Sequence, residues 1–125
     1  AMGGAIFNGT NGVVNMVATD DGRIKFENNT AAKGKDIYNE GTLNLAATSN
    51  SSIIFNSGID GNNGNINIGF GSNQNVGSVI FNNTIANQNV YLNSGVLQIG
   101  QNASTARTDY FDNQLKLYRF PLFGL

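Results

Sequence analysis

Hydrophobic and polar residues alternate in short runs along most of the chain. A period of two predicts strands that turn one face to a core and the other to solvent. Glycine or asparagine opens most of these runs, so each run predicts a short strand entered through a tight turn. The runs occupy residues 12–16, 22–26, 41–45, 52–55, 64–68, 77–81, 89–92 and 95–99.

Two series of similar segments recur at a longer spacing. In the first, Ile6, Ile37, Ile66 and Val90 follow one another at intervals of 31, 29 and 24 residues. In the second, Phe26, Phe55 and Phe81 follow at 29 and 26 residues. Such a period predicts a solenoid in which like strands stack on like strands, while loops such as residues 57–63 take up the insertions. We therefore expect an all-β, right-handed parallel β-helix of about four coils.

The small polar residues support the same architecture. The chain contains 22 Asn and 16 Gly, the two residue types that adopt left-handed backbone at corners most cheaply. Asn stacked on Asn in successive coils also forms amide ladders, whereas stacked carboxylates would repel. An antiparallel sandwich or meander is the alternative, because the Asn-Gly pairs at 8–9, 11–12 and 63–64 suit hairpin turns.

The pattern changes near the C-terminus. We assign residues 1–102 to the β-helix repeats and residues 103–125 to an irregular segment that acts as a C-terminal cap or begins the next coil. This segment holds the single proline and crowds apolar residues beside Lys116 and Arg119. A membrane-touching or partner-docking role for it remains an alternative.

Composition excludes several functions. The absence of Cys and His removes thiol nucleophiles, imidazole bases and most zinc, haem or iron–sulfur ligation. Seven scattered basic residues against eight acidic ones predict no nucleic-acid partner. No apolar run approaches the roughly 20 residues of a membrane helix, so no direct membrane insertion is expected. We predict no enzyme activity, no catalytic residue, no metal and no cofactor.

The acidic residues are the candidates for chemistry. Asp20, Asp21 and Gly22 predict a turn between two strands, where aspartate is common. The segment 60–65 is rich in oxygen ligands but offers one carboxylate, Asp60, whereas calcium takes six to eight oxygen ligands, usually with several carboxylates. A polar turn is therefore the preferred interpretation of this segment.

Two tetrapeptides carry a family resemblance. Gly3-Gly4-Ala5-Ile6 and Phe26-Glu27-Asn28-Asn29 resemble the paired Gly-Gly-Ala-Ile and Phe-x-x-Asn motifs of passenger domains in polymorphic outer-membrane autotransporters. The resemblance, over roughly residues 3–100, implies a β-helix displayed on a bacterial surface, many of which serve in adhesion. It also implies that the chain is a fragment of a longer passenger.

The aromatic residues divide into two expected sets. Phe7, Phe26, Phe55 and Phe81 recur at coil spacing and predict an internal stack. Tyr38 and Tyr91 are expected at equivalent places in their coils. With the nearby amides, they form the candidate ligand-binding strip, which would contact carbohydrate. Its residues are Tyr38, Asn39, Asn89, Tyr91 and Asn93.

The functional hypothesis is a secreted or surface-displayed segment that acts in adhesion or as a rigid stalk. Its expected partners are a host cell-surface protein or glycan, and many weak contacts would give avidity. Self-assembly through exposed coil ends is a second hypothesis. A polysaccharide-active enzyme and an ice-binding protein are lesser alternatives.

Overall fold

The computed structural model describes residues 1–69, 77–100 and 114–117, and in these ranges the chain is all-β. Among these residues there is no helix, and hence none that could cross a membrane. The strands are β1 (Ile6–Asn8), β2 (Val13–Ala18), β3 (Arg23–Phe26), β4 (Ile37–Asn39), β5 (Thr42–Ala47), β6 (Ser52–Phe55), β7 (Ile59–Gly61), β8 (Gly64–Ile68), β9 (Ser78–Phe81), β10 (Gln88–Leu92), β11 (Val96–Ile99) and β12 (Gln114–Leu117).

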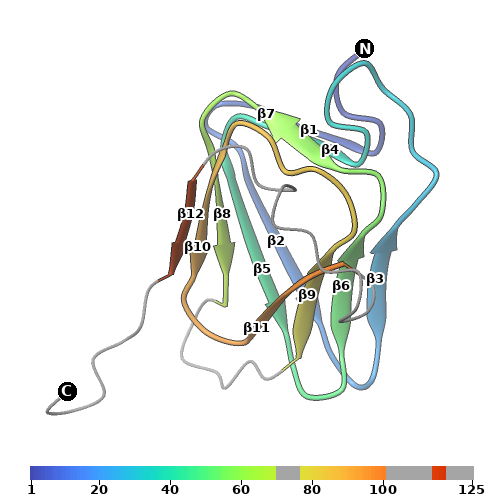
Figure 1. Ribbon diagram of the computed structural model, residues 1–125, viewed down its shortest axis with the longest axis vertical. Helices are drawn as coiled ribbons and strands as arrows, with labels where there is room; N and C mark the ends of the chain where they lie inside the picture. Colours follow the sequence, from blue (N-terminus) through green and yellow to red (C-terminus); the bar gives the residue numbers. More distant parts are fainter. Residues whose placement is uncertain (70–76, 101–113, 118–125) are drawn as a thin grey trace, which may run out of the picture.

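The strands form three parallel sheets that the chain visits in turn (Figure 1). The first sheet has the order β1-β4-β7, the second β12-β10-β8-β5-β2 and the third β11-β9-β6-β3. After β9, an isolated parallel bridge between Ile59 and Ile85 extends the first sheet, and β10 and β11 follow in the other two. The eight predicted strands are confirmed to within two residues at each end, and the antiparallel alternative is wrong for these strands.

The C-terminal prediction falls mostly outside the described residues. Within the segment 103–125, Gln114–Leu117 forms β12, which pairs in parallel with β10. Residues 103–113 and 118–125 lie outside the described ranges. The role of this segment, as a C-terminal cap or as the start of the next coil, therefore stays a prediction.

The core lies between the sheets, where inward side chains stack in register. In the second sheet Leu43 pairs with Ile66, and Ile66 with Val90; all three are fully buried. In the third sheet the rings of Phe26, Phe55 and Phe81 stack, with centroids 5.0 and 5.4 Å apart. The second predicted series and its phenylalanine stack are therefore confirmed for these three residues.

Phe7 does not belong to this stack. It is 52% exposed and lies against Tyr38 with a centroid distance of 5.4 Å. In β1 the neighbouring Ile6 packs against the core instead. Because successive residues of a strand face opposite ways, Phe7 must point outward.

The first predicted series is wrong at its middle step, from Ile37 to Ile66, whereas Ile66 does pair with Val90. Ile6 pairs with Ile37 as expected, but Ile37 continues to Ile59 in β7. Ile66 and Val90 belong to the second sheet. The predicted loop at residues 57–63 thus contains a strand of three residues, which is too short to display the period that identifies strands in a sequence.

Asparagine and aspartate occupy the corners, as predicted. Left-handed φ angles of 56 and 62° occur at Asp20 and Asp21, which form the predicted turn between β2 and β3. The other non-glycine residues with positive φ in the described ranges are Asn28, Asn50, Asn63 and Asn87.

A chain of three amides, from Asn8, Asn39 and Gln88, runs through the interior where the first sheet ends. We call it the interior ladder. Asn8 Nδ2 donates to Asn39 Oδ1 at 2.8 Å, and Asn39 Nδ2 donates to Gln88 Oε1 at 2.8 Å. The Gln88 amide in turn donates to the backbone oxygen of Asn39 at 2.9 Å. All three side chains are at least 95% buried, so these bonds satisfy polar groups that water does not reach.

Two glycines, Gly61 in β7 and Gly64 in β8, leave room for the Gln88 side chain to reach Asn39. Gly61 is the register partner of Asn39 in β7, and Gly64 is the register partner of Gln88 in β8. A Cβ on Gly61 would collide with the Asn39 backbone oxygen and the Gln88 amide nitrogen. The interior ladder therefore depends on a missing side chain.

We expect Gly61→Ala to lower the free energy of unfolding by about 1–3 kcal/mol, because the added methyl group overpacks this ladder. Gly9→Ala is the matched control, since a Cβ there would meet its nearest atom at 3.9 Å. Urea denaturation of both variants provides the measurement. Equal stability of the two variants would contradict the assigned role of Gly61.

Candidate functional site

The outer face of the second sheet carries two rows of polar side chains in register. The outer amide ladder consists of Asn15, Asn44 and Asn67, from β2, β5 and β8. The second row consists of Thr42, Asn65 and Asn89, from β5, β8 and β10. These positions alternate with the buried Leu43, Ile66 and Val90, so burying the apolar set turns both rows outward.

The outer amide ladder is held by side-chain hydrogen bonds. Asn44 Nδ2 donates to Asn15 Oδ1 at 2.9 Å, and Asn67 Nδ2 donates to Asn44 Oδ1 at 2.9 Å. In the second row Asn89 Nδ2 donates to Asn65 Oδ1 at 3.3 Å. The predicted stacking of asparagine on asparagine between strands is therefore confirmed. The outer amide ladder continues in register to Tyr91 of β10 and position 116 of β12.

The predicted strip is not one surface. Tyr38 lies in the first sheet, 8% exposed and stacked on Phe7. Asn39 is fully buried in the interior ladder. Tyr91 lies in the second sheet, so its expected equivalence with Tyr38 is wrong.

The other strip residues do gather at one place. Asn89 and Tyr91 belong to β10, on the outer face of the second sheet. Asn93 follows directly, and its Nδ2 donates to the Gly69 backbone oxygen at 3.3 Å. Carbohydrate contact by these three residues stays a prediction.

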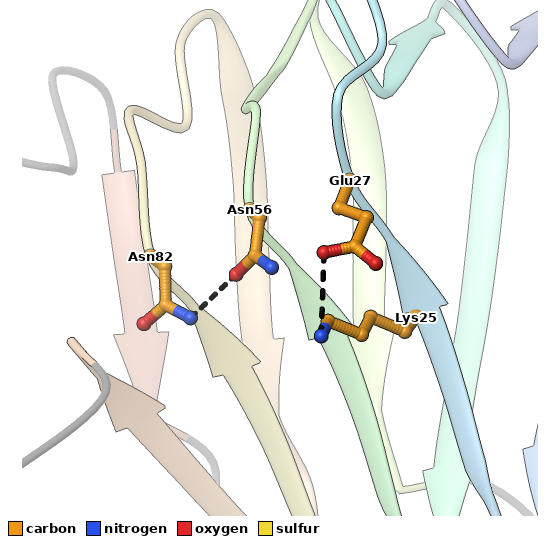
Figure 2. Close-up of polar contacts among 4 residues, drawn as sticks. All are labelled: Lys25, Glu27, Asn56 and Asn82. Atoms are coloured by element: carbon orange, nitrogen blue, oxygen red, sulfur yellow. Dashed lines mark hydrogen bonds and ion pairs between the residues drawn. The ribbon is translucent and has the colours of Figure 1, made fainter.

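The third sheet carries a second amide pair at its end (Figure 2). Asn82 Nδ2 donates to Asn56 Oδ1 at 2.7 Å, from the residues that follow β9 and β6. Nearby, Lys25 and Glu27 form an ion pair of 3.3 Å, with side chains 42 and 50% exposed. Exposed pairs of this kind contribute about 0–1 kcal/mol. Lys25 and Glu27 lie two residues apart in the same pass of the chain, so the amide contact, unlike the ion pair, links neighbouring strands.

A shallow groove lies beside the first sheet. It encloses about 180 Å³, and its lining includes Lys33, Lys35, Asp60 and Thr84. Asp60 Oδ1 accepts hydrogen bonds from the Gly61 backbone at 2.7 Å and from Asn87 Nδ2 at 3.0 Å. Among the described residues no three acidic side chains gather as they would around a metal ion.

Asp36 is a buried carboxylate whose hydrogen bonds hold two loops together. It is fully buried, and Asn29 Nδ2 donates to its Oδ1 at 2.8 Å. The backbone nitrogens of Ser57 and Gly58 donate to Oδ2 at 2.8 and 3.1 Å. The carboxylate thereby ties together two loops that lie 21 or more residues apart in sequence.

The sequence predicted asparagine stacked on asparagine between coils, but the outer amide ladder was not among its candidate sites. The available signal was an asparagine at the fourth position of three five-residue strand patterns, at residues 15, 44 and 67. Comparison with protein-family models, curated proteins and solved structures gave no match.

Proposed function

We propose that this chain is a segment of a right-handed parallel β-helix of about four coils, from a passenger domain displayed on or secreted from a bacterial cell. The register supports this proposal, because strands from successive passes of the chain pair in parallel in all three sheets. Each pass then stacks on the one before, as in a solenoid.

The places of the two tetrapeptides support the resemblance to polymorphic outer-membrane autotransporters. Gly3 and Gly34 both have positive φ, and a Cβ on either would strike the backbone oxygen of the isoleucine three residues later. Asn29, at the end of Phe-x-x-Asn, bonds Asp36 of the next Gly-x-x-Ile segment. The two motif halves thus join successive passes of the chain.

The proposed activity is adhesion to a host cell-surface protein or glycan, or service as a rigid stalk, without catalysis. The observation that carries it is the pair of polar rows in register on the outer face of the second sheet. Three of the described carboxylates fit a non-catalytic role, since Asp36 is occupied by loop contacts and Asp20 and Asp21 form a turn. Many copies on one surface would convert weak contacts into avidity.

Beads that carry the chain at increasing density test this proposal. We expect saturable binding to host cells, matrix proteins or glycans that strengthens steeply with density, because multivalent attachment multiplies weak contacts. Beads coated with heat-unfolded chain provide the control. Absence of binding at every density would contradict adhesion and leave the stalk role.

Self-association through the ends is a second candidate. Within the described residues, β1, β2 and β3 are the terminal strands of their sheets. On β2, Val13 and Val17 are 60 and 48% exposed. Terminal strands with apolar side chains invite pairing between molecules. Sedimentation that depends on protein concentration would support this candidate, and a constant monomer would exclude it.

A further inference from the structure

We propose that the outer face of the second sheet binds an extended, neutral polysaccharide that lies across the strands, along the outer amide ladder and the second row. This inference rests on the adhesive function proposed above and names its surface and its class of ligand. It keeps Asn89 and Tyr91 of the predicted strip but not Tyr38 and Asn39, which are buried elsewhere in the structure.

Each amide of the outer ladder keeps hydrogen-bonding capacity for a ligand. A carboxamide has two N–H donors and an oxygen with two lone pairs. Asn44 uses one donor and one lone pair within the ladder, and Asn15 uses one lone pair. Asn67 uses one donor. Among the described residues, the remaining donors and lone pairs of these three amides have no other partner.

The ladder also fixes the amides before a ligand arrives. Hydrogen bonds along the row hold each amide in one orientation, and the parallel register repeats it at a strand spacing of about 4.8 Å. On β5 and β8 the second row lies two residues before the outer amide ladder, about 6.6 Å away. Binding to such an array loses little side-chain entropy, which is the advantage of a preorganised site.

The chemistry of the array selects hydroxyl groups. Amides that offer both a donor and an acceptor match hydroxyls, which also donate and accept. An extended polysaccharide of β-linked pyranoses presents hydroxyls along its length at a repeat close to the strand spacing. None of the six residues in the two rows is charged, so these six offer no ion pair to an anionic chain. The first charged position in register with the outer amide ladder is Lys116, beyond Tyr91.

Tyr91 adds an aromatic surface at the next place along the outer amide ladder. Its side chain is partly exposed. Aromatic rings combine a large apolar surface with a defined geometry, and the C–H face of a pyranose ring packs against such a surface. A sugar chain that follows the ladder would therefore meet amides first and then this ring.

Affinity electrophoresis and calorimetry with the purified chain test the inference. The probes are hydroxyethylcellulose and xyloglucan as neutral glucans with an extended β-linked backbone, with heparin and alginate as anionic comparators. We expect the wild type to bind a neutral glucan, and longer oligosaccharides to bind more tightly than short ones. Binding of the anionic polymers alone, or of none, would overturn the proposal.

The key variant is the combined Asn15→Ala, Asn44→Ala and Asn67→Ala. Loss of several neutral hydrogen bonds predicts binding weaker by about tenfold or more. Asn56→Ala is the matched control, because it removes an amide contact of the same kind from the third sheet (Figure 2). Thermal unfolding confirms that both variants are folded, and equal binding by both would overturn the proposal.

The bead assay separates this inference from the adhesive function. If the triple variant still adheres to cells and soluble glucan does not compete, the assigned surface and ligand are wrong while adhesion stands. If wild-type beads do not adhere at any density, the adhesive function itself fails, whatever the electrophoresis shows.

Discussion

Replacing Phe55 with alanine lowers the free energy of unfolding by about 3–5 kcal/mol, the usual cost of removing a buried aromatic side chain. Phe55 is fully buried and lies between Phe26 and Phe81, with ring centroids 5.0 and 5.4 Å away. The substitution leaves a cavity at the centre of the stack and removes both ring contacts. The free energy of unfolding of a domain is only about 5–15 kcal/mol, so this single substitution removes a large part of it.

Guanidinium denaturation followed by circular dichroism measures the effect. Phe7→Ala is the matched control, since Phe7 is half-exposed and loses mainly one outer contact with Tyr38. We expect that control to cost about 0.5–1.5 kcal/mol, the range for one aromatic pair. Comparable losses in the two variants would show that the phenylalanine stack is not the centre of the core.

The contrast between Phe55 and Phe7 also explains why the sequence predicted the phenylalanine stack correctly but placed Phe7 in it wrongly. Phe26, Phe55 and Phe81 each end a strand of four residues, and their spacings of 29 and 26 residues identify them as one series in the sequence. Phe7 lies in a strand of three residues, between Ile6 and Asn8. Three residues are too few to show which side is inward, and both Ile6 and Phe7 are suitable for a core.

The interior ladder was beyond sequence reasoning for a related reason. Asn39 and Asn44 are the same residue type five positions apart, yet one is fully buried and the other lies on the outer face. The difference arises because Asn39 meets Asn8 and Gln88, which are 31 and 49 residues distant. Contacts of that kind depend on register and on the space beside Gly61, neither of which a local pattern contains.

The outer amide ladder is the more predictable of the two. Its asparagines lie between apolar residues that must face the core, so alternation alone turns them outward. The repeat period then suggests stacking, which is confirmed in the hydrogen bonds from Asn44 to Asn15 and from Asn67 to Asn44. The sequence alone does not predict which asparagine bonds to which, because the loops between strands differ in length from one pass to the next.

The second large effect is expected from Asn39→Asp, which changes one amide nitrogen to oxygen. Asn39 Nδ2 donates to the Gly41 and Asn65 backbone oxygens and to Gln88 Oε1, at 3.3, 3.2 and 2.8 Å. A carboxylate oxygen would face these three acceptors without a proton to share. We expect a loss of roughly 3–5 kcal/mol at pH 7, the cost typical of an uncompensated buried charge.

This loss depends on pH with a definite sign. Burial disfavours the charged form, so the pKa of the introduced carboxyl group is raised in the folded protein above its value of about 3.9 in the unfolded chain. Below that unfolded value both states are protonated, and the variant is at its most stable relative to wild type. As the pH rises, the unfolded state loses its proton first, and the variant loses up to about 1.4 kcal/mol per pH unit until the folded pKa is passed.

Asn15→Asp is the control, because it makes the same change from amide to carboxylate at a position that is not buried. It thereby separates the effect of burial from the effect of the substitution itself. Asn15 is exposed, and its described hydrogen bond uses only the side-chain oxygen as an acceptor, a role that a carboxylate also fills. We expect this variant to stay within about 0.5 kcal/mol of wild type, as surface substitutions usually do. Denaturation at pH 3.5, 5 and 7 should therefore separate the two variants progressively. Parallel pH profiles would mean that the amide at position 39 is exposed to water, which would remove the physical basis for an interior ladder.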